Sequence, residues 1–333
     1  MPDFRMTSVG AKEIKRIVVH KDCPDGIASA MILKNALHEE RAYGAEIEFV
    51  QYSTPEHRDM VAEPGMLFCD FAPHHTRTQD FLDAGSIVLD HHKSQKEVVM
   101  QFVESGRGAF ADEDERPGVS GALLAYECVW DPLNPSPGER MAPPNRAAVH
   151  KLARLAGIRD TWQTQAPEWK AACEQAEAMR FWGPERLLTV PPQGWGVKLK
   201  AVGERALERR LELASMCLSD AYRFTTPKGA RVVLFQGVHA VSDAAEEIDK
   251  DADVVVGFLL HMLDGEPDLI YSLRSHTDFD CAAFARAMSP GGGGHSRAAG
   301  FGLEIGLHAA NPFGLFRDLL IEYEEKNGNP EGD

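Results

Sequence analysis

The feature that most constrains the fold is a regular alternation of short apolar runs with helical stretches early in the chain. RIVVH at residues 16–20 precedes IASAMILKNALHEE, whose apolar residues recur at helical spacing. Further apolar runs of strand length occupy 45–50, 65–71 and 85–90, and residues 74–84 form the expected helix between the last two. Short strands alternating with helices indicate parallel βαβ units. The sequence therefore predicts an α/β domain with an open parallel sheet.

The middle of the chain is expected to be helical. Residues 120–130 and 145–162 both show helical patterns, separated by a proline-rich loop. The second pattern predicts a helix that stops at Gly157, followed by a loop that carries Asp160.

A second domain is expected after a long helix. Residues 198–219 are a charged amphipathic helical pattern, which suggests a connector. Beyond it, RVVLFQG, DVVVGFLL and DLIYSLRS predict strands of a smaller α/β domain. We therefore predict one domain over 1–190, a connector helix over 191–220 and a second domain over 221–333, which agrees with the usual domain count for 333 residues.

Charge and composition exclude several classes of protein. The formal net charge of −16 disfavours a protein that holds long duplex nucleic acid by neutralising phosphates. No apolar run approaches the roughly 20 residues that span a bilayer, and the polar N-terminus lacks the apolar core of a signal peptide. The six cysteines form no CxxC pair, which favours reduced thiols. We expect a cytoplasmic protein without membrane association.

Carboxylates and imidazoles gather at the ends of the predicted strands, in four separate stretches. They are His20, Asp22 and Asp25 in VVHKDCPDG, Asp70 in LFCDF, Asp90, His91 and His92 in VLDHH, and Asp160 in GIRDTW. Two adjacent histidines are poorly suited to a core, because the core would have to satisfy four ring nitrogens. So many acidic groups repel one another unless divalent cations compensate. Oxygen-rich ligands with a few imidazoles suit manganese or magnesium better than zinc.

These four stretches resemble the four motifs of the DHH phosphoesterase superfamily. GGGGHSRAAGF at 291–301 resembles the signature of its DHH-associated C-terminal domain, and SLRS at 272–275 is similar to the strand before that signature. Together the motifs cover nearly the whole chain. The resemblance implies a DHH domain with a two-metal site over 1–190, a DHH-associated substrate-binding domain over 221–333, and a cleft between them.

The resemblance also implies the metal ligands and the catalytic residues. The implied ligands are His20, Asp22, Asp25, Asp70, His91 and Asp160. Asp70 would bridge two ions of Mn²⁺, with Mg²⁺ as the alternative. The commonest first motif of the family separates its two aspartates by two residues, whereas Asp22 and Asp25 are three apart; we predict that both are ligands. Asp90 would orient His91, and His92 would face the substrate phosphate.

The glycine-rich signature implies substrate binding. Glycine lets backbone N–H groups approach an anion closely, and an arginine can clamp a phosphate with two hydrogen bonds. The implied substrate-binding residues are Arg274, Gly291, Gly292, Gly293, Gly294, His295 and Arg297. The alternative is that the glycine run is a flexible linker and Arg274 a surface residue of a strand.

Cys23 and Cys69 lie beside the first two motifs. Thiolates are soft ligands, whereas the other groups of the set are hard. We therefore predict that both cysteines serve packing and not metal binding.

The resemblance implies metal-dependent hydrolysis of phosphoester bonds. The favoured activity is removal of nucleotides from short single-stranded RNA or DNA, as in nanoRNases and RecJ-type exonucleases. One alternative is hydrolysis of a small nucleotide, either a 3′,5′-bisphosphonucleoside or a cyclic dinucleotide. A second is a domain that binds nucleotides without turnover. Inorganic pyrophosphatase activity is disfavoured, because those enzymes carry a C-terminal domain without GGGH.

Overall fold

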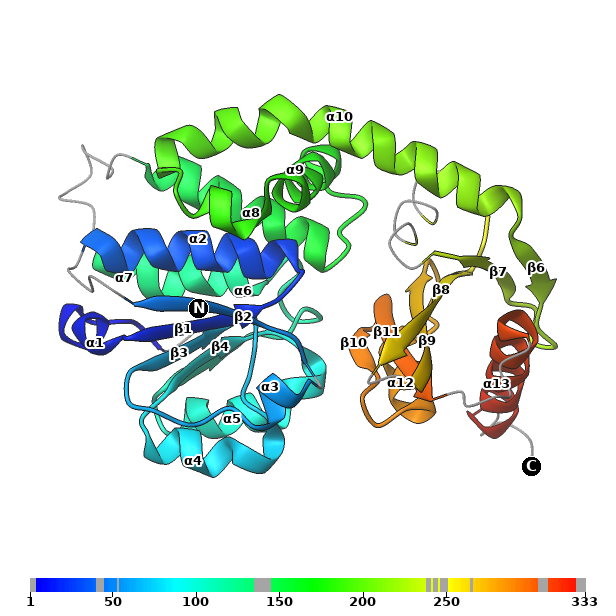
Figure 1. The fold of residues 1–333 in the computed structure, drawn as a ribbon, viewed down its shortest axis with the longest axis horizontal. Coiled ribbons are helices and arrows are strands. Elements are labelled where there is room, and N and C mark those ends of the chain that lie inside the picture. Colours follow the sequence, from blue (N-terminus) through cyan, green and yellow to red (C-terminus); the bar gives the residue numbers. More distant parts are fainter. Residues whose placement is uncertain are drawn as a thin grey trace. The chain divides into compact units, whose positions relative to one another are not determined.

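The computed structural model describes residues 4–39, 45–52, 54–134, 145–237, 241, 245, 251–263, 266–304 and 311–327. The chain divides into two compact units, Met1–Leu207 and Glu208–Asp333. The division falls within the long helix α10, Pro192–Ser219 (Figure 1). The domain limits given above stay predictions. Among the helices of the described ranges, none has the length and apolarity needed to cross a bilayer.

The first unit contains a sheet of five parallel strands in the order β2-β1-β3-β4-β5. The strands are β1 (Arg16–His20), β2 (Glu46–Val50), β3 (Met66–Cys69), β4 (Ile87–Asp90) and β5 (Gly108–Phe110). The helices are α1 (Ser8–Glu13), α2 (Pro24–Glu39), α3 (Pro55–Arg58), α4 (Thr78–Asp83), α5 (Lys96–Glu104), α6 (Gly121–Leu124), α7 (Asp131–Leu133), α8 (Arg146–Asp160) and α9 (Trp169–Leu187). The 3₁₀ turns are η1 (His75–Arg77) and η2 (Lys93–Gln95), and η3 (Ala125–Trp130) is π-helical.

Helices cover both faces of this sheet. Ile17 and Val19 of β1 belong to the same buried cluster as residues of α2, η3 and α8, whereas Val18 packs with Phe81 of α4 and Phe102 of α5. Figure 1 shows α2 and α6 on one side of the sheet and α4 and α5 on the other. Strands that are buried on both faces read as continuous apolar runs, because neither face needs polar residues. This explains why β1, β3 and β4 were predicted from their sequence, whereas β2, which was also predicted, is a partly exposed edge strand.

The predicted helix limits around Asp160 were wrong. Helix α8 does not stop at Gly157 but continues to Asp160. A Cβ at Gly157 would lie 2.1 Å from the carbonyl oxygen of Gly118, so the glycine permits a close approach of two backbones. Asp160 is thus fixed on the last turn of a helix and not on a loop.

The second unit contains a mixed sheet in the order β10-β11-β9-β8-β7-β6, in which only the β7–β8 pair is parallel. The strands are β6 (Tyr222–Thr225), β7 (Arg231–Gln236), β8 (Val254–Leu263), β9 (Glu266–Ser275), β10 (Gly293–His295) and β11 (Ala298–Glu304). Helices α12 (Cys281–Met288) and α13 (Pro312–Asn327) add Phe284 and Phe316 to its core, beside Tyr271 and Phe301. The predicted fold class, a parallel-sheet domain followed by a smaller α/β domain, is confirmed.

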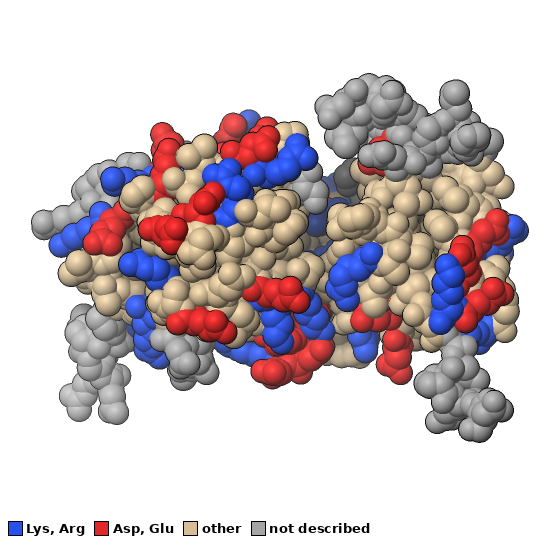
Figure 2. Space-filling model, turned by 90° about the horizontal axis from the view of Figure 1, so that it is seen from below, with Lys and Arg blue, Asp and Glu red and all other residues tan. Residues whose placement is uncertain are grey.

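The surface charge is mixed. On the face that Figure 2 shows, lysines and arginines are interspersed with aspartates and glutamates over each unit, and the residues drawn in colour form no large area of one sign. A duplex-binding protein normally presents a continuous basic face. This face therefore agrees with the expectation from the net charge.

Candidate metal centre

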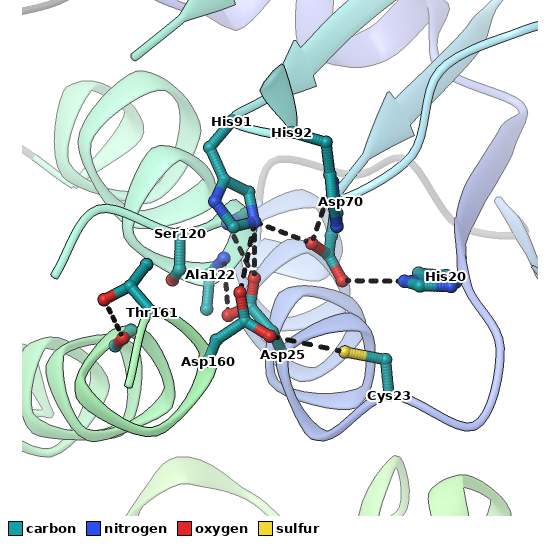
Figure 3. A network of polar contacts seen from close by, with 12 residues as sticks. His20, Cys23, Asp25, Asp70, His91, His92, Ser120, Ala122, Asp160 and Thr161 are labelled. Carbon is teal, nitrogen blue, oxygen red and sulfur yellow. Dashed lines mark hydrogen bonds and ion pairs between the residues drawn. The ribbon is translucent and has the colours of Figure 1, made fainter. Parts of the chain in front are cut away.

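Acidic and imidazole side chains from the four predicted stretches converge beyond the carboxyl edge of the parallel sheet (Figure 3). In open α/β sheets this edge is where ligands bind. The converging residues are His20 at the end of β1, Asp25 in the first turn of α2, Asp70 directly after β3, Asp90, His91 and His92 at the end of β4, and Asp160 at the end of α8. Groups that are up to 140 residues apart in the sequence thus form one cluster.

Asp70 lies between His20 and His91. One carboxylate oxygen, Oδ2, is 3.8 Å from Nδ1 of His20, and the other, Oδ1, is 3.1 Å from Nε2 of His91. The side chain is fully buried, and its backbone is left-handed, with φ of +56°. Aspartate and asparagine tolerate this conformation better than most residues. The tight turn after β3 therefore directs this carboxylate into the cluster.

His91 contacts a second set of carboxylates. Its Nε2 is 3.7 Å from Oδ2 of Asp25 and 3.5 Å from Oδ2 of Asp160. Among the described residues of this unit, three groups of possible ligand atoms have all their atoms within 4.8 Å of one another. They are Asp25, His91 and Asp160; His20, Cys23 and Asp70; and Asp70, Asp90, His91 and His92. The first two share no residue, and they are the two ligand groups considered below.

Helix α2 begins so that Asp25 enters the cluster. Pro24 occupies the first helical position, where its fixed φ suits the helix, and the acidic side chain of Asp25 is favoured in the first turn by the helix dipole. A Cβ at Gly26 would lie 2.2 Å from the carbonyl oxygen of His20, so only glycine allows α2 to pack this closely on the end of β1. The PDG sequence is explained by this geometry.

Backbone amides of helix α6 hold Asp25. Gly121 N donates to Oδ2 of Asp25 at 2.7 Å, and Ala122 N donates to Oδ1 at 3.2 Å. Gly121 also packs directly on Asp70, since a Cβ there would lie 2.3 Å from the Cβ of Asp70. The thiol of buried Cys69 donates to the Gly121 carbonyl at 3.2 Å, in agreement with a packing role for this cysteine.

Asp90 orients His92. Its Oδ1 accepts hydrogen bonds from Nδ1 of His92 at 2.7 Å and from the backbone N of His91 at 2.8 Å. Tyr52 donates to Oδ2 of Asp90 at 3.3 Å and accepts from Ala72 N at 3.0 Å. We predicted that Asp90 would orient His91. The structure instead directs its side-chain hydrogen bond to the ring of His92.

Burial of so many charges shifts their pKa values. Burial, followed by the negative charge of Asp160, raises the pKa of Asp25 to about 6. Burial and the charge of Asp25 raise the pKa of Asp70 well above its usual range. Burial, followed by the charge of His92, lowers the pKa of His20 to about 4. The imidazole of His20 is therefore neutral at pH 7, which is the form that binds a metal.

Asp90 behaves differently from the other carboxylates. Burial opposes its ionisation, but the charge of His92 and the hydrogen bonds from His92 and His91 outweigh burial and lower the pKa of Asp90. Asp90 therefore stays ionised and accepts the hydrogen bond from His92 throughout the neutral pH range.

The donor set fits divalent cations. Two buried atoms that face each other, Nδ1 of His20 and Oδ2 of Asp70, find no hydrogen-bond partner among the described residues. Unsatisfied polar atoms at a buried site are costly, and a bound cation removes this cost. Carboxylate oxygens and neutral imidazoles are suitable ligands for such an ion. The group of Asp70 adjoins the group of His91, because Oδ1 of Asp70 is 3.1 Å from Nε2 of His91, and together the two groups fit two ions.

Comparisons with known proteins agree with this description of the fold. No family model and no curated protein sequence matches the chain, but solved structures do. The DHH domain of a protein from a family of ribosomal proteins matches with a TM-score of 0.58 and 12% identity, over 96% of this chain and 87% of that one. This chain has the DHH fold. RecJ of Thermus thermophilus, in complex with Mn²⁺, matches with a TM-score of 0.57 and 19% identity. The match covers 95% of this chain and 53% of RecJ. This chain therefore spans about half the length of RecJ.

One of the predicted metal ligands, Asp22, lies outside the cluster. Asp22 is exposed and belongs to neither ligand group, whereas its neighbour Cys23 belongs to the group with His20 and Asp70. The Sγ of Cys23 lies 3.9 Å from Oδ1 of Asp160. Burial and the charges of Asp160 and Asp25 raise the pKa of this thiol.

The predicted substrate-binding residues meet in the second unit. Ala298 of β11 pairs with both His295 of β10 and Arg274 of β9, and Ser275 N donates to the carbonyl oxygen of Arg297 at 3.0 Å. Arg297 lies exposed in the turn between β10 and β11. Three of the predicted side chains therefore occupy one corner of this sheet.

The glycine run is structured and does not form a linker. Gly293 and Gly294 belong to strand β10. A Cβ at Gly292 would lie 2.1 Å from the carbonyl oxygen of Ala285 in α12, and Gly294 has φ of +133°. Close packing within the unit thus requires these two glycines, whether or not an anion binds to the run.

Sequence reasoning missed Tyr52 and Gly121. Tyr52 follows β2 by two residues, so it also lies at the carboxyl edge of the sheet, and this position was the available signal. Gly121 follows Ser120, which caps α6 by accepting a hydrogen bond from Leu123 N. A serine before an apolar helical run is a recognisable N-cap. Nothing in the local sequence indicates that the next residue contacts Asp70.

Proposed function

We propose that this protein is a metal-dependent phosphodiesterase that hydrolyses short single-stranded oligonucleotides, RNA or DNA. The observation that carries the proposal is the position of Asp70, a buried carboxylate that faces His20 with one oxygen and His91 with the other. A buried cluster of this kind at the carboxyl edge of a parallel sheet is a site for chemistry and not for packing. The DHH fold, shared with RecJ, supports the proposal.

The proposed cofactor is two ions of Mn²⁺, with Mg²⁺ as the alternative. His20 and Asp70 would hold one ion, and Asp25, His91 and Asp160 would hold the other, with Asp70 shared. Such ions, when bound, polarise phosphoryl oxygens, activate water and neutralise developing charge. The structure of RecJ that matches this chain contains Mn²⁺.

The residues around the proposed ions position the substrate. Asp90 accepts a hydrogen bond from Nδ1 of His92 and is itself held by the hydroxyl of Tyr52. With Nδ1 donating to Asp90, the second ring nitrogen, Nε2, can donate to a phosphate oxygen when the ring is protonated, since both ring nitrogens of an imidazolium are donors. Asp90 and His92 are thus the proposed catalytic pair, with Asp90 acting through the orientation of the His92 ring.

The second unit is proposed to bind the nucleotide end of the substrate. Arg274, His295 and Arg297 gather at one corner of its sheet and offer cationic and hydrogen-bonding groups to a phosphate. Their contribution would be binding rather than chemistry. The net charge of −16 favours short substrates, since a long strand needs a continuous basic track.

This division of labour predicts a substrate-dependent effect of Arg297→Ala. We expect kcat/KM for a short oligonucleotide to fall by roughly 10- to 100-fold, since a charge-assisted hydrogen bond contributes about 1.5–3 kcal/mol. A small chromogenic phosphodiester that engages only the metal centre should change less than about threefold on the same scale. Arg223→Ala, an exposed arginine on β6, serves as the control. Equal losses on both substrates would show that Arg297 does not recognise the nucleotide.

A product time course tests the proposed function. Labelled RNA and DNA of graded short lengths are incubated with the Mn²⁺-loaded protein, beside a 3′,5′-bisphosphonucleoside and a cyclic dinucleotide. Successive release of mononucleotides from the oligonucleotides is the expected result. Cleavage of the small nucleotides alone would favour the alternative substrate class. Stoichiometric metal and nucleotide binding without any product would indicate a binding module.

A further inference from the structure

Cys23 occupies the place in the cluster where Asp22 was predicted. Its Sγ belongs to the group whose possible ligand atoms all lie within 4.8 Å of one another, together with a ring nitrogen of His20 and a carboxylate oxygen of Asp70. Figure 3 shows the thiol directed toward the carboxylate of Asp160, beside the place where Asp70 and His20 face each other. The loop between β1 and α2 therefore delivers a sulfur, and not a carboxylate, to this group.

The backbone conformation of the loop explains why Cys23, and not Asp22, enters the cluster. Asp22 has φ of +57°, a left-handed conformation that aspartate tolerates. The resulting turn leaves Asp22 exposed and half-buries Cys23, while Pro24 starts the helix immediately afterwards. At the other end of this loop, α2 packs closely on the end of β1, since a Cβ at Gly26 would lie 2.2 Å from the carbonyl oxygen of His20.

A second observation points to a ligand at this position. Asp70 is fully buried, and its Oδ2 finds no hydrogen-bond partner among the described residues although it faces His20. The facing Nδ1 of His20 is in the same situation. Two unsatisfied atoms and a sulfur that converge on one point are the arrangement of a metal site.

We propose that Cys23 is a ligand of the ion held by His20 and Asp70. This inference rests on the proposed metal centre and assigns it an unequal pair of sites. The group of His20, Cys23 and Asp70 offers nitrogen, sulfur and oxygen, whereas the group of Asp25, His91 and Asp160 offers only nitrogen and oxygen. Thiolate ligands favour Zn²⁺, Co²⁺ and Fe²⁺ over Mn²⁺ and Mg²⁺. The first site should therefore select a softer ion than the second, which revises the packing role predicted for Cys23.

Co²⁺ provides a test that does not depend on activity. A thiolate bound to Co²⁺ gives a charge-transfer band in the near ultraviolet, which oxygen and nitrogen ligands do not give. The full-length protein is titrated with Co²⁺, and bound cobalt is measured by equilibrium dialysis. We expect the band to saturate at one Co²⁺ per chain in the parent and in Cys217→Ser, whose thiol lies on α10 outside the cluster. The band should be absent in Cys23→Ser and in Cys23→Asp.

Metal preference gives a second measurement. In Cys23→Asp, the ratio of Zn²⁺ affinity to Mn²⁺ affinity at the site of His20 and Asp70 should fall by at least about tenfold. Removing a residue that only supports a metal ligand typically lowers metal affinity by about this factor. A further measurement uses the parent protein and therefore does not depend on whether a variant folds. One equivalent of Zn²⁺ should protect Cys23 of the parent from alkylation by iodoacetamide, as measured by peptide mass mapping.

The outcomes separate this inference from the proposed function. Cobalt that binds without a charge-transfer band, a band that persists in Cys23→Ser, or alkylation of Cys23 at an unchanged rate in the zinc-loaded protein would each overturn the role of Cys23 and leave the metal centre standing. A protein that binds no divalent ion stoichiometrically would overturn both.

Discussion

The Asp70→Asn variant should lose phosphodiester hydrolysis by roughly 10³-fold in kcat/KM. Asp70 faces both His20 and His91, so its loss weakens the binding of both proposed ions. Loss of several kcal/mol of transition-state stabilisation corresponds to about a factor of ten for each 1.4 kcal/mol. Asparagine is the appropriate substitution, because it also tolerates the left-handed backbone at this position, with φ of +56°. Steady-state kinetics on the chromogenic phosphodiester under saturating Mn²⁺ would measure the effect.

The matched control is Asp22→Asn. Asp22 has nearly the same backbone conformation, with φ of +57°, but is exposed and lies outside both ligand groups. Its variant should keep near-parental rates. A loss at Asp22 comparable to that at Asp70 would contradict the assignment of the cluster and restore Asp22 as a ligand.

Asp70→Asn should at the same time stabilise the metal-free protein, and the gain should grow with pH. The pKa of Asp70 is raised by burial and by the charge of Asp25, so the folded parent loses stability as the pH rises from the ordinary pKa of an aspartate to this raised pKa. Asparagine carries no charge at any pH, so the difference between variant and parent increases over this pH range and is constant above the raised pKa. For a unit of 207 residues, about 1 kcal/mol corresponds to roughly 2–4 °C in Tm. Thermal unfolding with chelator at several pH values measures this, and a gain that shrinks as the pH rises would contradict the buried charge.

The Gly121→Ala variant should lose about 10²-fold in kcat/KM although Gly121 carries no functional group. An added Cβ would lie 2.3 Å from the Cβ and 2.7 Å from the Cα of Asp70, so the carboxylate must move. A displacement of about 1 Å at a catalytic group can cost about 10²-fold. The amide of Gly121 also donates to Asp25 at 2.7 Å, so both ligand groups are disturbed. Metal titration followed by kinetics at saturating metal distinguishes weakened binding from misplacement.

Gly196→Ala is the control for this substitution. Gly196 also lies in a helix, α10, but a Cβ there meets nothing within 4 Å. Since alanine is favoured over glycine in helices by about 1 kcal/mol, this variant should be active and slightly more stable. Parental activity in Gly121→Ala would show that the contact with Asp70 relaxes without consequence for the centre.

The sequence predicted the parts of this fold that depend on local pattern. Strands β1, β3 and β4 are buried on both faces and therefore appear as apolar runs, and the polar ends of β3 and β4 marked Asp70 and the histidine pair. The convergence of these ends followed from the parallel arrangement alone. The three-residue strand β5, in contrast, is too short to show a pattern.

The rest of the site depends on contacts between distant residues, which no local pattern records. Gly157 looked like a helix stop but serves a close contact with Gly118. Asp22 and Cys23 are neighbours, and only the left-handed turn at Asp22 decides which side chain enters the cluster. The pairing of Asp90 with His92 rather than with the His91 ring is likewise a matter of geometry after the strand end.

If the cluster around Asp70 holds metal ions, hydrolysis depends on them. The protein is dialysed exhaustively against chelator, its metal content is determined, and oligonucleotide hydrolysis is followed before and after titration with Mn²⁺. We expect activity to fall to background in the metal-free protein and to recover as up to two ions bind per chain. Tm should rise in parallel, because the ions compensate the buried carboxylates around Asp70. Undiminished hydrolysis by protein that contains no bound metal would contradict this expectation.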